Sequence, residues 1–533
     1  MISKQHGILL ITIVLLFLTA CTTDGESKVE NKEKKRDELV LSIKGEPSNG
    51  FDPTTGWGRY GSPLFQSTLF KRDNDLNIVN DLAIGYEVSE DGKVWTVTLR
   101  EDVTFSDGVN LTGEDVKFTF ETALQKGSIV DFTNLEKVEV EDNFTVKFTL
   151  KSPQSTFIHS LVETGIVPMH AYSVKYAQQP IGSGPYEFVQ WDKGQQLIVK
   201  ANPNYYGDKP YFQQLTFLFL NEDATFAAAQ AGQVDIAAIP ATFTHNEVKG
   251  MRLEAIRSVD SRGIAFPYVE SGHTTEDGLP IGNDVTADPA IRKAMNVAID
   301  RQALIDGVLD GYGSKAYTSV DGLPWWNEET VFEDSNLLQA EQILADAGWI
   351  DSDDDGIVEK DGVKAQFSLY YPADDAIRQS LSIVVADMLK PLGIAINVEG
   401  ASWDKIEQKM YSNAVMMGWG SHNPQELYNV YSSNFAGIEY YNTGFYKNDV
   451  VDGYLEKALT SNDVEEALSY WKKAQWDGTT GISADTPWAW LVNIDHVYLI
   501  KEDLDIGNQR VQPHGHGWPL TSNIEQWKWV KEE

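Results

Sequence analysis

Strand-like and helix-like segments alternate along most of this 533-residue chain, and this alternation limits the folds that it can adopt. Four segments have the β-branched content or the alternation of apolar and polar residues that is typical of strands, at residues 39–43, 95–99, 138–140 and 144–150. Three longer segments have helical periodicity, at residues 289–310, 336–347 and 376–389. In the first of these, Asp288 is the expected N-cap before Pro289, and a break is expected near Asp300. Strands that alternate with helices indicate an α/β fold with more than one lobe.

The composition is that of a large folded protein and excludes several classes. The chain contains 15 Trp, 22 Tyr and 22 Phe, which is too much core-forming material for a disordered protein. Its length corresponds to roughly two to four domains. Because 79 acidic residues outnumber 43 Lys and Arg, the net charge is -36, which repels nucleic-acid backbones, and we expect no nucleic-acid partner. A single Cys allows no internal disulfide and no Cys-rich metal site.

The N-terminus has the pattern of a secretory signal. A basic residue precedes an apolar run at residues 7–18, which is shorter than the ~20 residues that a spanning helix needs. The next residues, LTAC at 18–21, resemble the bacterial lipoprotein signal, in which Cys21 receives the lipid. We therefore expect a lipoprotein signal peptide at residues 1–20, lipidation of Cys21 and a flexible tether at residues 21–37 on the extracytoplasmic face of the cell membrane. The alternative is an uncleaved signal anchor in which the cysteine is incidental.

Residues 82–108 combine two tight turns with a strand. Asp91-Gly92 and Ser106-Asp107-Gly108 are typical turn sequences, and between them Trp95, Val97 and Leu99 alternate onto one face. This segment resembles the signature of the family 5 extracellular solute-binding proteins, the dipeptide, oligopeptide and nickel receptors of ABC importers. Similar segments follow at residues 114–120, 181–186, 202–206, 231–235 and 288–305, so the resemblance covers nearly everything from residue 39 onward. Maintenance of the fold alone also explains most of these segments.

The resemblance implies an α/β, two-lobed periplasmic-binding-protein-like fold of class II, large cluster C type, with a hinge between the lobes. It predicts lobe I at residues 38–262 with an inserted subdomain at about residues 71–180, lobe II at residues 263–495 and a return to lobe I at residues 496–533. Such receptors close over a solute because contacts from both lobes exist only in the closed form. The expected partners are an ABC permease and its ATPase subunits, and the receptor is expected to be a monomer.

Four of the nine His residues lie in the last quarter of the chain and are candidate metal ligands: His422, His496, His514 and His516. His514 and His516 flank a Gly in a loop that also contains Pro, so both imidazoles can turn toward one point. Imidazole binds Ni, Cu and Zn, and binding by such a pair would weaken below about pH 6.5. A His-Gly-His loop is about as often structural or exposed. The ending is similar to the nickel-receptor branch of the family, which implies nickel or a nickel chelate as the solute, although residues 51–60 contain no His.

One Arg and several aromatic residues are candidate walls of a binding cleft. They are Trp57, Arg59, Tyr60, Trp403, Trp419, Trp488 and Trp490. Aromatic rings bury large areas and attract cations, but protein cores use the same residues, so core packing is the more common explanation for any single ring. Arg59 lies beside aromatic residues in an acidic protein and can hold a carboxylate in a two-pronged geometry. The alternative for Arg59 is a surface ion pair.

A run of Asp residues resembles the first half of a calcium loop. Asp351, Asp353 and Asp355 offer oxygen ligands at alternate positions, and Gly356 suits the sharp turn. Position twelve of this loop is Gly362, where a calcium loop needs a bidentate Glu. The pattern therefore favours an Asp-rich turn over a calcium site.

The sequence predicts a receptor rather than an enzyme. It contains no Gly-x-Ser-x-Gly elbow, His-Glu-x-x-His motif, phosphate-binding Gly loop or dinucleotide fingerprint. The favoured solute is nickel, free or chelated, with His514 and His516 as the main ligands and His422 or His496 as further candidates. The alternative is a di- or oligopeptide receptor, in which Arg59 and cleft carboxylates hold the peptide termini.

Overall fold

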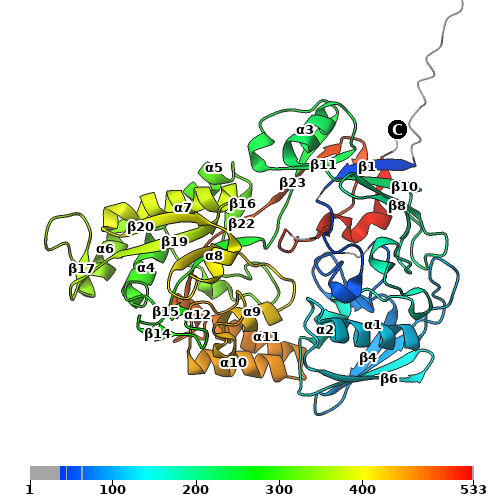
Figure 1. The fold of residues 1–533 in the computed structure, drawn as a ribbon, viewed down its shortest axis with the longest axis horizontal. Coiled ribbons are helices and arrows are strands. Elements are labelled where there is room, and N and C mark those ends of the chain that lie inside the picture. The colour runs from blue at the N-terminus through cyan, green and yellow to red at the C-terminus, as the bar shows by residue number, and fades with distance from the viewer. Residues whose placement is uncertain (1–36, 44, 62–63, 516, 531–533) are drawn as a thin grey trace, which may run out of the picture. The chain divides into compact units, whose positions relative to one another are not determined.

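A computed structural model describes residues 37–43, 45–61, 64–515 and 517–530. These residues belong to one compact unit that begins at Arg36 (Figure 1). The expected signal peptide, Cys21 and all of the expected tether except Asp37 lie outside the described residues, and so does His516.

A seven-stranded sheet brings the two ends of the described chain together. Its strand order is β12-β23-β11-β1-β10-β9-β8. Strand β1 pairs in parallel with β10 and β11, and the other pairs are antiparallel. The helix α3 (Glu222–Gln230) packs against β11. The strands are β1 (Glu38–Ser42), β8 (Tyr186–Asp192), β9 (Gln196–Ala201), β10 (Gln214–Leu218), β11 (Ile236–Ile239), β12 (Met251–Ile256) and β23 (His496–Lys501).

A six-stranded sheet, in the order β16-β22-β13-β21-β19-β20, forms a second centre of the fold. Helices α4, α5 and α7 pack on it, α6 packs on α4, and their apolar faces bury a core with the sheet. Its strands are β13 (Ser261–Ala265), β16 (Gly313–Lys315), β19 (Gln366–Pro372), β20 (Ala395–Ala401), β21 (Ala414–Met417) and β22 (Trp488–Ile494). The helices are α4 (Pro289–Ala298), α5 (Arg301–Val308), α6 (Leu337–Asp346) and α7 (Ala376–Leu389).

The break predicted near Asp300 is confirmed. The side chain of Asp288 accepts a hydrogen bond from the backbone N–H of Ala290 and starts α4. Asp300 then accepts one from the N–H of Ala303 and starts α5. Because an N-cap residue has extended backbone angles, Asp300 separates two helices that the periodicity alone would join.

A four-stranded antiparallel sheet, in the order β4-β5-β7-β6, packs on the helix α1 (Gly113–Lys126). Trp95, Val97 and Leu99 of β5 are buried on one face, as their alternation predicts. The Asp91-Gly92 turn joins β4 to β5, and Gly92 takes a φ of 69°, which favours glycine. The strands are β4 (Ala83–Val88), β5 (Val94–Leu99), β6 (Leu135–Asp142) and β7 (Thr145–Leu150).

The chain passes between the two large sheets at two places that lie side by side. The first crossing joins β12 to β13, between Ile256 and Ser261, and the second joins β22 to β23, between Ile494 and His496. The hydroxyl of Ser258 donates to the carbonyl oxygen of Ile494 at 2.5 Å, which ties the first crossing to the second. The two crossings are therefore joined to each other by a hydrogen bond.

The remaining elements are short or lie around the sheets. The other helices are α2 (Phe157–Glu163), α8 (Trp403–Glu407), α9 (Gln425–Tyr431), α10 (Asp449–Thr460), α11 (Val464–Gln475) and α12 (Ile482–Asp485). Two-stranded sheets pair β2 (Phe70–Arg72) with β3 (Ile78–Asn80), β14 (His273–Thr274) with β15 (Pro280–Ile281), β17 (Glu359–Lys360) with β18 (Val363–Lys364), and β24 (Leu504–Asp505) with β25 (Lys528–Trp529).

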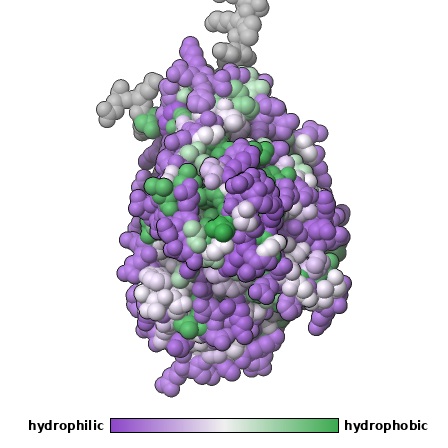
Figure 2. Space-filling model, turned by 90° about the vertical axis from the view of Figure 1, so that its left-hand side faces the viewer, coloured by the Kyte–Doolittle hydropathy of each residue, from purple (hydrophilic) through white to green (hydrophobic). Residues whose placement is uncertain are grey.

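The molecular surface is mainly polar on one face (Figure 2). Figure 2 shows one face of the molecule, covered mainly by hydrophilic residues with a small hydrophobic area. A net charge of -36 keeps such a surface strongly hydrated. Within the part of the chain that the structure describes, every helix is too short or too polar to cross a membrane.

Candidate ligand-binding site

Three cavities meet at Arg59 and Tyr60, and together they form the candidate ligand-binding site. Cavity A, of about 80 Å³, is lined by Lys71, Arg72, Glu163, His422 and Arg510 besides this pair. Cavity B, of about 110 Å³, is lined by Glu163, Trp419, Asn423, Glu426 and Tyr441 as well. Cavity C, of about 350 Å³, is lined by Glu46, Trp57, Ile129, Gly515 and Trp518 as well. The predicted cleft residues Trp57, Arg59, Tyr60 and Trp419 thus line neighbouring cavities that share two wall residues.

Arg59 is the cation at the junction of the three cavities. Its guanidinium carbon lies 4.5 Å from the centre of the Tyr60 ring, and its side chain is half-buried. Among the described residues, no carboxylate lies within salt-bridge distance of Arg59. A guanidinium that has an aromatic neighbour and no ion pair is free to bind a ligand carboxylate with two hydrogen bonds.

Two half-buried carboxylates face cavity B from different helices. Glu163 ends α2 and Glu426 lies in the first turn of α9. One oxygen of Glu426 accepts hydrogen bonds from the backbone N–H groups of Gly420 and Ser421, both at 3.0 Å. Burial raises the pKa of each carboxyl to about 7. Both carboxyls therefore titrate near neutral pH.

Two buried polar atoms that line these cavities lack a partner among the described residues. They are Nε2 of His422, in cavity A, and Nε1 of Trp419, in cavity B. Burial and the nearby Arg72 hold the pKa of His422 well below its ordinary value, so the imidazole is neutral. Because buried polar atoms rarely stay unpaired, these two are candidate contacts for a ligand.

Arg72 fixes the position of His422. Its guanidinium donates to the backbone oxygen of His422 at 2.5 Å and lies 2.6 Å from Nδ1 of His159. Burial lowers the pKa of Arg72 to about 10, so it keeps its charge at neutral pH. Arg72 thus connects β2 to the segment that carries both unpartnered atoms.

The other two described His candidates lie together at the crossing between the sheets. Nδ1 of His514 lies 2.5 Å from Asp260 Oδ1, and Nε2 of His496 lies 3.5 Å from Asp260 Oδ2. Burial lowers the pKa of His514. The structure therefore groups His514 with His496 and leaves His422 in cavity A, while the prediction for His516 falls outside the described residues.

Three predicted aromatic candidates are not in the three cavities. Trp488 and Trp490 stack at 4.5 Å on one face of β22 and line a separate cavity of about 30 Å³. The indole N–H of Trp490 donates to Tyr431, also buried, at 2.8 Å. Trp403 packs edge-on against Tyr440 at 5.3 Å. These contacts are those of core packing.

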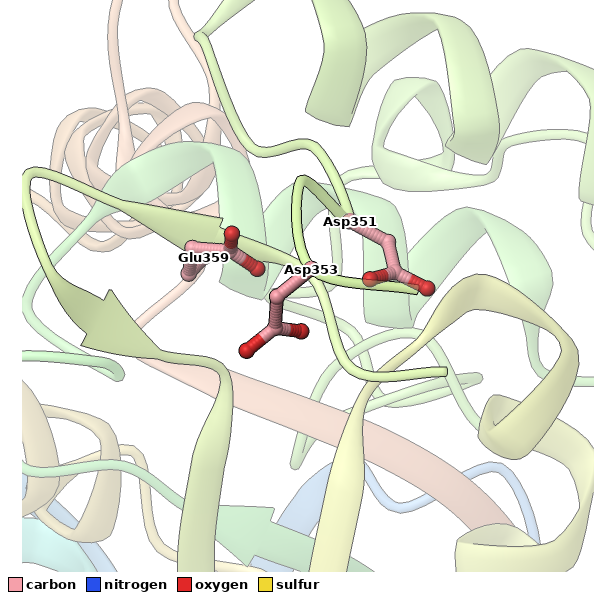
Figure 3. Close-up of side chains that lie close together, drawn as sticks. All are labelled: Asp351, Asp353 and Glu359. Carbon is pink, nitrogen blue, oxygen red and sulfur yellow. The ribbon is translucent and has the colours of Figure 1, made fainter. Parts of the chain in front are cut away.

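The Asp-rich segment forms a closed turn. Figure 3 shows the carboxylates of Asp351, Asp353 and Glu359 close together; their oxygens lie within 4.8 Å of one another. Asp351 accepts hydrogen bonds from backbone N–H groups of its own turn, and Lys364 pairs with Asp353 and Asp355. Backbone N–H groups and Lys364 already bind the carboxylates of Asp351, Asp353 and Asp355, so the structure supports an Asp-rich turn and does not support calcium.

Several residues of the site were missed by the sequence analysis. Glu163, Glu426, Arg72 and Arg510 line the cavities, and Asp260 organises the His residues at the crossing. Each comes from a different segment of the chain. Glu426 alone had a local signal, because it closely follows the predicted Trp419 and His422.

The chain is similar to several known proteins. Protein XP55 of Streptomyces lividans is 33% identical over 505 residues, covering 91% of this chain and 89% of that protein. NikZ of Campylobacter jejuni, solved in complex with Ni(L-His), is 26% identical to this chain with a TM-score of 0.76. The match covers 92% of this chain and 99% of the NikZ chain. The oligopeptide-binding protein AppA of Bacillus subtilis, solved with a nonapeptide, is 26% identical to this chain with a TM-score of 0.67. The match covers 93% of this chain and 99% of the AppA chain.

The family profile agrees with these similarities. Residues 77–441 match the bacterial extracellular solute-binding proteins, family 5. Such proteins have a two-lobed α/β fold, bind solutes rather than transform them, and work with an ABC permease and its ATPase. This chain belongs to family 5 of the bacterial extracellular solute-binding proteins.

Proposed function

We propose that this chain captures a nickel chelate outside the cell and delivers it to an ABC permease. The observation that carries the proposal is the pair of unpartnered polar atoms, His422 Nε2 and Trp419 Nε1, in cavities that meet at Arg59. The Ni(L-His) complex of NikZ, at 26% identity, supports nickel with an amino-acid chelator as the solute.

The residues suit a chelate better than a bare ion. In the described part of the chain, three His, Cys or acidic ligand atoms come within 4.8 Å only at Asp351, Asp353 and Glu359, outside the cavities. His422 would therefore supply one nitrogen ligand, and the chelator would supply the others. Arg59 would bind a chelator carboxylate, and Trp419 would donate its indole N–H to a chelator oxygen.

We assign lobe I to the seven-stranded sheet, with the four-stranded sheet as its inserted subdomain, and lobe II to the six-stranded sheet. The hinge consists of the two crossings. Glu163 and Arg59 come from lobe I, whereas Trp419, His422 and Glu426 come from lobe II. Because contacts from both lobes exist together only when the cleft is closed, binding would favour closure.

His514 and His496 have a supporting role in this proposal. Asp260 orients the His514 ring, as a carboxylate orients the imidazole in many metal sites. Pro513 lines cavity A and Gly515 lines cavity C, so the loop of His514 lies against the site. His516 remains a candidate ligand from the same loop. The lipid anchor at Cys21 would hold the monomeric receptor at the membrane near its permease.

Calorimetric titration of metal-stripped protein tests this function. We expect saturable heat with Ni²⁺ plus L-histidine, weaker heat with Ni²⁺ alone and none with a nonapeptide. His422→Gln should weaken binding of the nickel–histidine complex at least tenfold, and Arg59→Gln should do the same by removing the carboxylate contact. Unchanged affinity in both variants would overturn this site.

A peptide receptor is the second candidate. The volume of about 350 Å³ in cavity C can hold several side chains, and AppA of Bacillus subtilis was solved with a nonapeptide. In this case Arg59 binds the peptide carboxylate, and Glu163 or Glu426 accepts the ammonium group. Heat with the nonapeptide and none with nickel and histidine would favour this function.

A further inference from the structure

A contact remote from the three cavities joins the two lobes assigned above. The side-chain N–H of Asn462 donates to the carbonyl oxygen of Glu90 at 2.7 Å, in the turn between β4 and β5. The backbone N–H of Ser155 donates to the carbonyl oxygen of Leu459 at 2.6 Å, and its hydroxyl donates to that of Ala458 at 2.8 Å. The α10–α11 end of one lobe thus meets the β4–β5 hairpin and the segment before α2 of the other (Figure 1).

Ser155 binds carbonyl groups at the C-terminal end of α10, a helix of the other lobe. Ala458 and Leu459 are among the last residues of α10, and the last carbonyl groups of a helix have no N–H partner within it. Ser155 satisfies both carbonyls with its N–H and its hydroxyl. When the lobes separate, water must replace both bonds.

A side chain at Gly92 would displace Asn462 from this contact. A Cβ atom built there would lie 2.1 Å from Oδ1 of Asn462, and the φ of Gly92 is 69°. Gly92 belongs to the Asp91-Gly92 turn, which the sequence analysis attributed to the hairpin alone. The close approach of Asn462 gives this turn a second reason for glycine.

A third contact leads from this region to the ligand-binding site. The hydroxyl of Thr156 donates to Oε1 of Gln425 at 2.8 Å, and Gln425 donates to Asn429 at 2.9 Å. Gln425 precedes Glu426, and both line cavity B. The row of contacts therefore runs from the outer hairpin to the wall of the site.

We infer that these contacts form a latch that sets how long the closed cleft persists and so how slowly a solute leaves. The latch comprises Glu90, Ser155 and Thr156 on one side and Gln425, Ala458, Leu459 and Asn462 on the other. Its contacts are neutral hydrogen bonds, and no ion pair between described residues crosses it. Neutral bonds of this kind are individually weak, so the latch can open, and salt should affect it little.

The latch acts through the closing equilibrium. When the closed fraction of the protein decreases, the apparent affinity decreases by the same factor. A weaker latch therefore raises the apparent Kd and the release rate together. Loss of one neutral hydrogen bond corresponds to about a two- to tenfold change. The contacts between the lobes can be tested without a solute, whereas the effect on release rests on the proposed function.

Hydrogen exchange of the Ser155 amide in the solute-free full chain tests the latch without any ligand. We expect Asn462→Ala and Gln425→Ala to speed this exchange about two- to tenfold, although neither residue touches the Ser155 N–H. The matched control is Asn413→Ala, which removes a bond of similar length, 3.0 Å from Asn413 to the Lys409 carbonyl oxygen, within one lobe. Equal exchange in the parent and both latch variants would overturn the inference.

Release of the nickel–histidine complex provides the second measurement. Ser155→Ala should speed release about two- to tenfold, Ser155→Thr should restore the parent rate, and Ser380→Ala should match the parent. Ser380 is the matched control because its hydroxyl bonds the carbonyl of Ala376 within α7. Release from Ser155→Ala at the parent rate would contradict the latch. If no complex binds at all, the proposed function fails, and the exchange of the Ser155 amide still decides the latch.

Discussion

Asp260 Oδ1 lies 2.5 Å from His514 Nδ1, so one carboxylate on the first crossing between the sheets holds the C-terminal loop. The same oxygen lies 2.5 Å from the guanidinium of Arg262, and the other carboxylate oxygen faces His496. Burial opposes ionisation of Asp260, but Arg262 and His514 hold its pKa well below the ordinary value. The ionised carboxylate is therefore the common partner of three segments at the hinge.

Asp260→Asn should destabilise the protein strongly. The amide keeps the shape but removes the charge that compensates the buried Arg262, and breaking a buried pair costs about 3–5 kcal/mol. Denaturant unfolding should show this loss in the free energy of unfolding. Asp353→Asn, in the exposed turn, is the control and should change stability by less than about 0.5 kcal/mol. A cost below about 1 kcal/mol for Asp260→Asn would contradict the role assigned to this carboxylate.

Glu163 and Glu426 should make stability depend on pH. Burial raises the folded-state pKa of each carboxyl to about 7 from its ordinary value of 4.5, so between these values the folded state binds more protons than the unfolded state. The free energy of unfolding should therefore fall as pH rises from about 4.5 to about 7, by roughly 2 kcal/mol for each carboxyl. The contribution is fully present only below the unfolded-state pKa.

Unfolding of Glu426→Gln at pH 5 and pH 7.5 measures this dependence. The amide stays neutral, so the variant should gain stability relative to the parent at pH 7.5 and little at pH 5. Glu341→Gln is the control, because Glu341 is exposed on α6. An equal difference between parent and Glu426→Gln at both pH values would show that Glu426 does not titrate in this range.

Gly182→Ala should be costly because of packing rather than ligand binding. A Cβ at Gly182 would lie 2.0 Å from the backbone oxygen of Phe65, so a backbone segment must move. We expect a loss of about 2–3 kcal/mol in urea unfolding. At Gly85 of β4 a Cβ meets nothing within 4 Å, so Gly85→Ala should have little effect and serves as the control. Equal stability of the two variants would refute the close approach.

Much of the fold could be predicted from local patterns. The helix predicted at residues 376–389 is α7 with the same bounds, and the Asp300 break follows from a capping residue. The segment at residues 181–186 was also explained correctly by fold maintenance, since Gly182 lies against Phe65. Periodicity and capping act over a few residues, so one sequence is enough to detect them.

The site depended on distant residues and was only partly predictable. Arg59 and Trp419 stood out by residue type, but Glu163 meets cavity B from a helix end more than 250 positions before Glu426. His496 and His514 are joined by Asp260, which no spacing rule connects to them. Tertiary packing brings these groups together, and no local pattern encodes it.

Trp419 and Trp488 should respond differently to the same substitution. Trp419 stacks on Tyr441 at 5.1 Å in cavity B, and its buried N–H lacks a partner among the described residues. Trp488 is buried against Trp490 in the core. Trp419→Leu should therefore weaken solute binding about five- to tenfold with little change in stability, whereas Trp488→Leu should lower the free energy of unfolding by about 2–3 kcal/mol and leave the affinity of the folded protein unchanged. Calorimetry with the nickel–histidine complex and with the nonapeptide, beside urea unfolding of both variants, measures the two effects. If Trp419→Leu lost stability and kept its affinity for whichever solute binds, cavity B would be part of the core and the solute would lie in cavities A and C alone.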